Sequence, residues 1–143
     1  MDDLISGLLD FGEEGSLTKA QLDLILAAMP FDLDLIDEND IIRYHSPEPR
    51  VFRRQPGVQG MDVRLCHPMK SQAALGEMLA AFKSGEADRS EAWLDRGERF
   101  IHIVYYALRD AEGVYRGCLE VSYDAAHVRS LEGSRRDSVF YKD

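Results

Sequence analysis

The fold of this chain is decided by the stretch Arg99-Phe-Ile-His-Ile-Val-Tyr-Tyr-Ala-Leu-Arg-Asp-Ala-Glu-Gly-Val-Tyr-Arg-Gly-Cys-Leu-Glu-Val-Ser-Tyr123. Two segments rich in β-branched and aromatic residues flank a turn signal, and this pattern predicts a long β-hairpin. The turn runs from Asp110 to Gly113 and fits a three-residue loop, in which Gly113 adopts the left-handed conformation as a bulge. Glycine takes that conformation without steric cost.

The register of this hairpin follows from its turn, which pairs Asp110 with Val114. In that register the odd-numbered residues of both strands share one face, which we expect to pack in the core. These residues are Ile101, Ile103, Tyr105, Ala107, Gly117, Leu119, Val121 and Tyr123. The opposite face carries both apolar and polar residues. A four-residue loop would shift the register by one residue and turn His102 inward instead.

Length and charge limit what the chain can do. Its 143 residues suit one domain with a real core. The 17 basic and 26 acidic residues give a net charge of −9, which repels phosphate backbones and anionic lipids. We therefore expect neither nucleic acid nor a membrane as a partner.

Signals for export, membrane insertion and disulfide bonding are absent from the sequence. The first residues, Met-Asp-Asp, are acidic where a signal peptide would be basic, and no apolar run approaches the roughly 18 residues of a spanning helix. Cys66 and Cys118 are too few for a disulfide framework and lack the spacing of a metal knuckle. These features favour a cytoplasmic protein with two free thiols.

Two helices are predicted before residue 31. In residues 2–11 the apolar side chains are spaced as on one face of a short helix: Leu4, Ile5, Leu8, Leu9 and Phe11. Residues 11–16 break this segment. Thr18 and Gln21 form a capping box that opens a second helix, and Pro30 ends it. The apolar stripe of the second helix either docks on the domain itself or forms a dimer contact.

A second hairpin and a loop occupy the next part of the chain. The alternating residues 31–37 and the segment 41–45 predict two antiparallel strands. Residues 46–62 are rich in Pro, Gly and Arg and predict a loop with at most short helical turns. The loop contains a small basic cluster that we expect to be solvated surface: Arg50, Arg53 and Arg54.

A long helix and another strand complete the pattern. Residues 68–83 have apolar side chains at helical spacing, Pro68 suits the first turn, and Gly85 follows the end. Residues 90–94 predict a strand that a short turn joins to the long hairpin. The order is two strands, an irregular region, a helix and three strands.

This order and three sequence features resemble the PAS sensory domain. The features are the hairpin of residues 31–44, Gly60 and Cys66-His67-Pro68 before the long helix, and Arg109 to Gly113 followed by Gly117. More narrowly, residues 18–30 and 91–106 resemble the PAS modules found behind hemerythrin-like domains in bacterial proteins. The resemblance covers residues 18–132, which leaves 1–17 as an N-terminal helical extension and 133–143 as a C-terminal tail.

The resemblance implies an α+β fold, the PAS fold, with a five-stranded antiparallel sheet in the order 2-1-5-4-3. The long helix then covers one face, the N-terminal helix lies against the other, and a cavity lies beneath the long helix. The resemblance further implies a sensor or signalling module that binds a small ligand and acts on a partner protein. A homodimer through the helix of residues 18–29 and the outer face is expected. The expected ligand-binding residues are Cys66, His67, Leu79, Phe82, Trp93, Tyr105, Leu119 and Tyr123.

The ligand itself stays open. Haem, with His67 as axial ligand, is one alternative, because the His-Pro step resembles that of the oxygen-sensing haem PAS phosphodiesterases of enteric bacteria. Cys66 would compete as a thiolate ligand. A ligand-free dimerisation module is a second alternative, and a thiol-dependent enzyme using Cys66 is a third. We expect no catalytic activity, since no carboxylate is placed by the sequence to orient His67.

Overall fold

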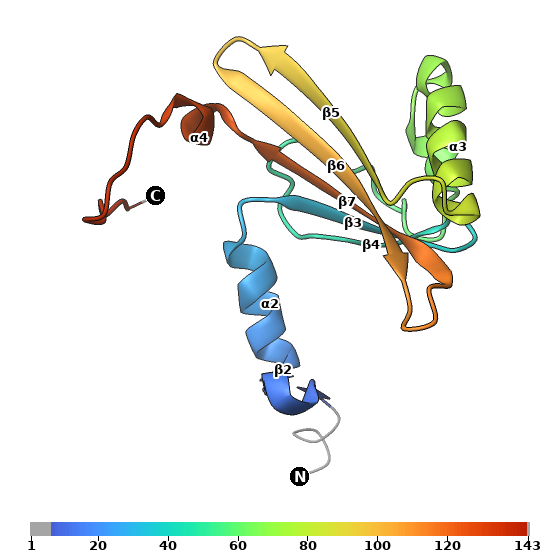
Figure 1. Cartoon of the computed structure of the whole chain (residues 1–143), viewed down its shortest axis with the longest axis horizontal. Coiled ribbons are helices and arrows are strands. Elements are labelled where there is room, and N and C mark those ends of the chain that lie inside the picture. Colours follow the sequence, from blue (N-terminus) through green and yellow to red (C-terminus); the bar gives the residue numbers. More distant parts are fainter. Residues whose placement is uncertain (1–6, 143) are drawn as a thin grey trace.

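The protein forms a five-stranded antiparallel sheet with a long helix on one face (Figure 1). The structure is a computed structural model that describes residues 7–142. The strands lie in the order β4-β3-β7-β6-β5, which confirms the predicted order and the α+β architecture. Their bounds are β3 Asp32–Asp37, β4 Ile42–His45, β5 Arg89–Arg96, β6 Arg99–Arg109 and β7 Tyr115–Asp124.

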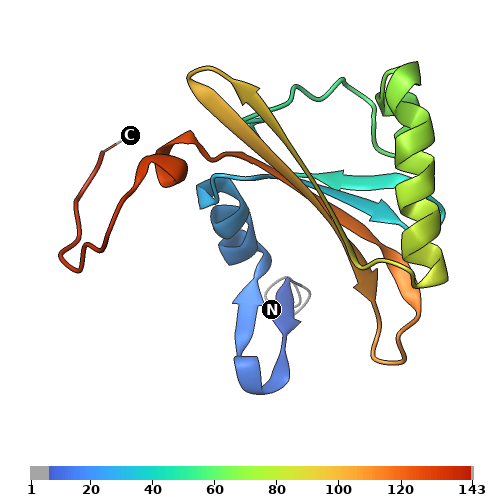
Figure 2. The same ribbon diagram turned by 45° about the horizontal axis from the view of Figure 1, so that its top comes forward.

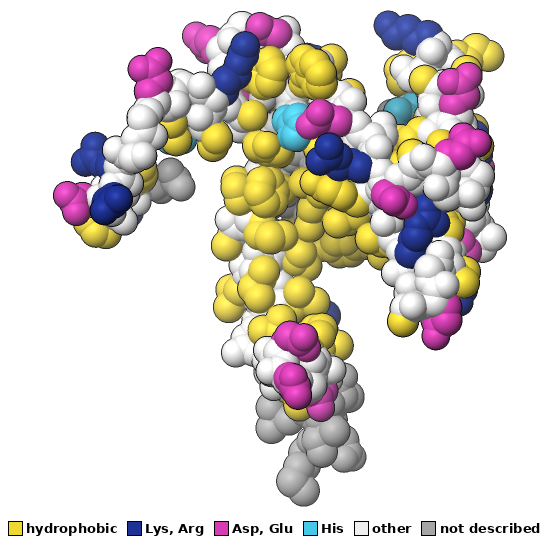
Figure 3. Space-filling model, in the orientation of Figure 1, with side chains coloured by type: hydrophobic (Ala, Val, Ile, Leu, Met, Phe, Trp, Pro, Cys, Tyr) yellow, Lys and Arg dark blue, Asp and Glu magenta, His cyan; other side chains and the backbone are white. Residues whose placement is uncertain are grey.

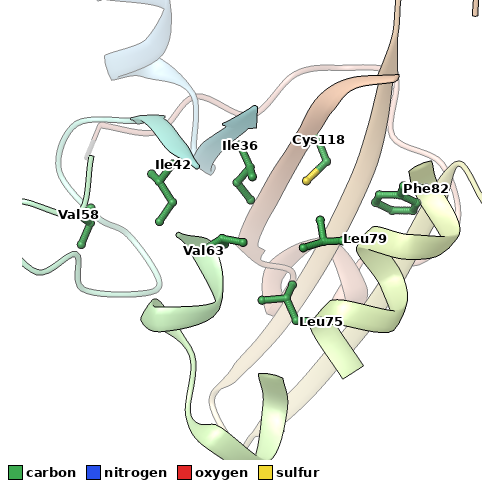
Figure 4. Packing of buried hydrophobic residues seen from close by; sticks show 8 residues of the cluster. All are labelled: Ile36, Ile42, Val58, Val63, Leu75, Leu79, Phe82 and Cys118. Carbon is green, nitrogen blue, oxygen red and sulfur yellow. The ribbon is translucent and has the colours of Figure 1, made fainter. Parts of the chain in front are cut away.

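The long helix α3 (Met69–Ser84) begins and ends within one residue of its predicted bounds. Pro68 stands at the N-cap, and Gly85 follows the helix in the left-handed conformation at φ 85°. With the short helix η2 (Val63–Cys66), α3 encloses the core against β3, β4 and β7 (Figure 4). The buried cluster consists of Ile36, Ile42, Val58, Val63, Leu75, Leu79, Phe82 and Cys118. Burying each large side chain of this set contributes about 1.5–3 kcal/mol.

The turn of the long hairpin has the predicted form. Gly113 has φ 81°. The Asp110 N–H donates to the Val114 carbonyl at 3.0 Å, and the Gly113 N–H donates to the Asp110 carbonyl at 2.9 Å. The three-residue loop is therefore confirmed.

Beyond the turn the register differs from the prediction. Arg109 pairs with Tyr115, but Leu108 pairs with Gly117, so Arg116 is an extra residue in β7. One extra residue in one strand is a β-bulge, and it moves every later side chain of that strand to the other face.

The bulge corrects the predicted faces of β7. The core face holds the predicted odd-numbered residues of β6 together with even-numbered residues of β7: Cys118, Glu120 and Ser122. Three predicted core residues of β7 lie on the outer face instead: Leu119, Val121 and Tyr123. The bulge is tied to Gly117, whose backbone runs so close to β3 that an added Cβ would lie 2.1 Å from the Ile36 carbonyl oxygen.

Residues 8–18 form a hairpin, although a helix was predicted for residues 2–11. β1 (Leu8–Asp10) pairs with β2 (Ser16–Thr18), and the short helix η1 (Gly12–Glu14) joins them. Gly12 and Gly15 have φ 69° and 99°, and the Phe11 N–H donates to the Gly15 carbonyl, which closes the turn. The predicted helix of residues 2–11 is therefore wrong over β1, and its part before residue 7 lies outside the described residues.

Helix α2 (Lys19–Ala28) opens with the predicted capping box. The Thr18 hydroxyl accepts from the Gln21 N–H, and the Gln21 side chain accepts from the Thr18 N–H. The helix extends away from the sheet (Figures 1 and 2), and none of its residues is buried. In this structure α2 thus leaves the outer face uncovered, and its Leu24 is 70% exposed.

The last described element is the short helix α4 (Ala126–Ser130), which follows β7. The Asp124 carboxylate accepts from the N–H groups of Ala126 and Phe100, so it joins the start of α4 to β6. Across residues 7–142, none of the helices has both the length and the apolar character needed to cross a membrane.

Candidate functional site

A cavity of about 650 Å³ lies between the core face of the sheet, α3 and the loop before η2. Such a volume suits a small organic ligand. Most of the wall is apolar and comes from the sheet, the loop, η2 and α3. These apolar residues include Ile36, Ile42, Val58, Met61, Val63, Leu75, Met78 and Ile103.

The structure brings three of the eight predicted site residues to this cavity: Cys66, His67 and Tyr105. Leu79 and Phe82 are fully buried core residues outside the cavity wall. Leu119 and Tyr123 were expected in the cavity wall but lie on the outer face, because the bulge at Arg116 reverses β7.

Trp93 also lies outside the cavity. It pairs with His102 of β6, which places it on the outer face, and it is 59% exposed. Its predicted place in the cavity wall is therefore wrong. The outer face also carries Tyr106 and Leu108, and hydrophobic side chains gather on α2 and on the sheet beside it in Figure 3.

A polar cluster, which we define as Asp34, Arg54, His67, Tyr105 and Glu120, lines one part of the cavity. Asp34 pairs with Glu120 across β3 and β7, and Glu120 pairs with Tyr105 across β7 and β6. The sheet therefore places these three side chains in one row. Sequence reasoning missed Asp34, Arg54 and Glu120 as site residues.

Arg54 and Asp34 form an ion pair inside the cavity wall. The Arg54 Nε donates to Asp34 Oδ1 at 2.9 Å, and its Nη2 donates to the second carboxylate oxygen. The side chains are only 14% and 10% exposed. Arg54 is thus a partly buried partner of the sheet, which corrects its predicted place on the solvated surface, while Arg53 is exposed as expected.

Glu120 is the carboxyl group of the cluster without an ion-pair partner among the described residues. The Ser122 hydroxyl donates to Glu120 Oε1 at 3.3 Å, and Tyr105 faces Glu120 across β6 and β7. Burial raises the pKa of Glu120, and the charge of Asp34 adds to this effect. The neighbouring Tyr105 hydroxyl and the charge of Arg54 act in the opposite direction. A partly buried carboxyl with a raised pKa in a cavity is typical of a functional site.

His67 sits between η2 and α3 with its ring fixed. Its Nδ1 lies 2.9 Å from the Val63 carbonyl oxygen, so Nδ1 carries the proton in this contact. Its Nε2 lies 3.5 Å from the Tyr105 hydroxyl. The histidine of the His-Pro step therefore lies at the cavity.

The loop that carries Arg54 is held by one carboxylate. Asp32 is 1% exposed and accepts from the N–H groups of Arg50, Val51 and Phe52 at 2.7, 2.8 and 3.1 Å. Three oriented N–H groups compensate a buried charge. Asp32 therefore sets the path of the cavity wall without lying in the cavity.

The two thiols are not activated. Burial raises the pKa of Cys66, and the charges of Asp34 and Asp62 add to this effect. Burial also raises the pKa of Cys118, to about 12. Within residues 7–142, no group of three His, Cys, Asp or Glu side chains could hold a metal ion.

The raised pKa of Glu120 predicts how stability depends on pH. A group whose pKa is higher in the folded than in the unfolded state favours folding at low pH and disfavours it once pH rises through the folded pKa. We therefore expect Glu120→Gln to match the wild type near pH 4.5 and to be more stable at pH 8. The expected difference is a gain at pH 8 that is absent near pH 4.5, because only the ionised carboxyl is disfavoured in the folded state.

Urea unfolding at the two pH values measures this difference. A variant that is less stable than the wild type at pH 8 would mean that the Glu120 carboxylate makes a stabilising interaction in the empty protein.

The chain is similar to known proteins in both sequence and fold. Residues 22–126 match the family model described as PAS domain. The chain is 30% identical to a C-terminal domain from Streptococcus mutans, with a TM-score of 0.79 over 87% of this chain and 97% of that one. No curated protein matches at a significant level.

Two further solved structures share the fold. A sensory box sensor histidine kinase from Vibrio cholerae is 16% identical, with a TM-score of 0.52 over 74% of this chain and 90% of that one. The PAS domain of a protein from Colwellia psychrerythraea is 12% identical, with a TM-score of 0.55 over 76% of this chain and 98% of that one.

Proposed function

This chain belongs to the PAS domain family, and we propose that it is a sensor whose cavity binds a small ligand and whose ligand state is read by a partner. PAS sensory domains occur in histidine kinases such as the Vibrio cholerae protein of the same fold. The observation that supports ligand binding is the cavity of about 650 Å³, with an apolar wall and a polar cluster at one part of it. Binding sites for small molecules have this composition.

The route from the cavity to a partner runs through the sheet. Asp34, Tyr105 and Glu120 reach the cavity from the three central strands, and the same strands form the outer face. The outer face exposes Trp93 and Tyr106 by 59% and 41%, and α2 exposes Leu24 beside it. We propose a homodimer through α2 and this face, because exposed apolar surface of this kind is typical of interaction sites.

The proposed sensor has no catalytic role for Cys66. A thiol acts as a nucleophile in its thiolate form, and the raised pKa of Cys66 disfavours that form. The His67 Nδ1 donates to the Val63 carbonyl instead of facing a thiol. A thiol-dependent reaction is therefore the weakest of the alternatives.

Haem is the second candidate, and the geometry of His67 favours it. The histidine that binds a metal commonly donates its other N–H to a backbone carbonyl, as the His67 Nδ1 does to Val63. His67 lines the cavity, and its Nε2 is held by the Tyr105 hydroxyl only at 3.5 Å. Bound there, haem would be held by His67 and would supply redox or gas-binding chemistry.

Native mass spectrometry of the protein purified from cells tests the proposed function. We expect a carried ligand that adds mass under native conditions and is lost on denaturation. Ile103→Trp places a larger side chain in the cavity wall and should abolish the added mass. Tyr106→Trp on the outer face of the same strand is the matched control and should retain it.

Two outcomes would contradict this proposal in different ways. Wild type without added mass would favour the ligand-free dimerisation module. Added mass that persists in Ile103→Trp would place the ligand outside the cavity. An absorbance spectrum of the same sample identifies haem, whose Soret band should be lost in His67→Ala and retained in Cys66→Ala if His67 is the ligand.

A further inference from the structure

Glu120 lines the cavity but forms no ion pair within residues 7–142. The cavity wall holds two carboxyl groups, Asp34 and Glu120, and two guanidinium groups, Arg53 and Arg54. Arg54 pairs with Asp34, whereas Arg53 is exposed and pairs with neither carboxyl group. Since His67 Nδ1 is already used by the Val63 carbonyl, its ring presents only Nε2 to the cluster. The Glu120 carboxyl is therefore left without a cation beside it.

Arg54 already has an anionic partner. Its Nε and Nη2 donate to the two oxygens of Asp34, and its Nη1 donates to the Phe52 carbonyl at 2.9 Å. These bonds use three of the five N–H donors of the guanidinium, and Asp34 already compensates its charge. An incoming carboxylate or phosphate would place a second anion beside this partly buried ion pair and compete with Asp34, which is costly.

Glu120 is in the opposite position. Ser122 donates to one of its oxygens at a long distance of 3.3 Å, and the single hydroxyl proton of the neighbouring Tyr105 is shared between Glu120 and the His67 Nε2. An ionised carboxylate has about four acceptor sites, so these few neutral donors leave acceptor capacity facing the cavity. Glu120 itself is part of the cavity wall. A ligand with a protonated amine would supply both the missing charge and the missing donors.

The apolar wall of the cavity indicates what the uncharged part of such a ligand would be. The cavity wall also includes the apolar side chains of Ile36, Ile103, Leu75 and Met78. Apolar contacts of this kind favour a hydrocarbon or aromatic body over a second charged group. The ligand that fits both parts has one cationic end and one apolar end.

From this arrangement we propose that the ligand of the cavity is a small organic cation, with its ammonium group bound by Glu120 and its apolar body lying along β6 and α3. The proposal rests on the proposed ligand-binding function and names its ligand class. It assigns Arg54 to the support of Asp34 and the loop, and it assigns recognition of the ligand charge to Glu120.

Calorimetric titration with three matched compounds tests this proposal. The compounds are 2-phenylethylamine, 2-phenylethanol and phenylacetate, which share the apolar body and carry a cation, a neutral group and an anion. The titrations use full-length protein freed of carried ligand, at pH 7.5, where the amine is protonated. We expect saturable one-to-one binding of the amine, at least tenfold weaker binding of the alcohol, and no binding of phenylacetate.

Two variants separate charge recognition from folding. Glu120→Gln keeps the size of the side chain and one acceptor oxygen but removes the charge, and it should weaken amine binding at least tenfold while leaving binding of the alcohol unchanged. Glu112→Gln removes a carboxylate from the exposed turn of the same hairpin and should change neither. Circular dichroism on both variants verifies that they are folded.

The remaining outcomes overturn the proposal in distinguishable ways. Equal affinity for amine and alcohol, or amine binding unaffected by Glu120→Gln, would leave a ligand-binding cavity without charge recognition by Glu120. Tightest binding of phenylacetate would assign recognition to Arg54. If none of the three binds, the cation proposal fails, and the added mass in native spectra then decides separately whether the cavity binds a ligand at all.

Discussion

Gly117→Ala is expected to unfold the domain, with a loss of about 5 kcal/mol or more in the free energy of unfolding. An added Cβ would lie 2.1 Å from the Ile36 carbonyl oxygen and 3.0 Å from the Asp37 Cα. Both atoms belong to the backbone of β3, so no side-chain rotation can relieve the overlap. The φ of Gly117 is 132°, a conformation that other residues rarely adopt. Losses above 4–5 kcal/mol are exceptional and indicate such a clash.

Gly113→Ala is the matched control, because it has the same chemical change and a positive φ of 81° but nothing within 4 Å of the added Cβ. Its expected cost is about 1 kcal/mol, from the left-handed conformation alone. Far-ultraviolet circular dichroism and urea unfolding measure both variants. If Gly117→Ala folds with a loss similar to that of Gly113→Ala, β3 and β7 do not approach each other as closely as described.

Asp32→Ala is expected to lower the free energy of unfolding by about 3 to 4 kcal/mol. The change leaves the N–H groups of Arg50, Val51 and Phe52 without their acceptor. Each unsatisfied buried donor costs about 1–3 kcal/mol, and the half-buried loop lets water compensate part of this. Because the same loop continues to Arg54, we also expect the ion pair with Asp34 to loosen and ligand affinity to fall.

Urea unfolding measures the stability of Asp32→Ala, and limited trypsin digestion reports cleavage after Arg50, Arg53 and Arg54. Faster cleavage in the folded variant is expected. Asp32→Asn keeps an acceptor oxygen and should lose about half as much stability. Asp23→Ala removes an exposed carboxylate of α2 and should have almost no effect. A full loss in Asp32→Asn together with unchanged loop cleavage would contradict the role assigned to Asp32.

Local signals in the sequence were enough to predict the five strands of the sheet and the helices α2 and α3. The turn from Asp110 to Gly113, the capping box of Thr18 and the glycine after α3 each depend on neighbours within a few residues. All three form as predicted. The hairpin of β1 and β2 was missed because short apolar segments suit a helix and a strand equally well, and here two glycines decide for the strand.

The register of β7 could not be predicted from local signals. Its bulge at Arg116 goes with the close approach of Gly117 to Ile36, and this contact joins residues far apart in the chain. The turn alone gave the register only as far as Arg109. The predicted site residues depended on the predicted register of β7. Because that register lacked the bulge, Leu119 and Tyr123 were expected in the cavity, where the structure has Glu120.

The polar cluster could not be predicted either, because it also depends on contacts between residues far apart in the chain. Asp32, Asp34 and Ile36 share one face of β3, and two carboxylates on one face are not typical of a strand that faces a core. The loop residues Arg50 to Phe52 bury Asp32, and Arg54 compensates Asp34. These partners follow from the path of an irregular loop, which periodicity does not describe.

The position of β7 between β3 and β6 has a consequence for synthesis on the ribosome. The first hairpin, β3 with β4, and the second, β5 with β6, can each pair as soon as they emerge. The strand that joins the two hairpins is β7, which pairs with β3 and with β6. It is the last of the five strands in the chain and is therefore made last. Until Tyr115–Asp124 has left the exit tunnel, β3 and β6 each present an unpaired edge. Such edges pair readily with other chains, so the nascent domain is most exposed to aggregation just before its completion.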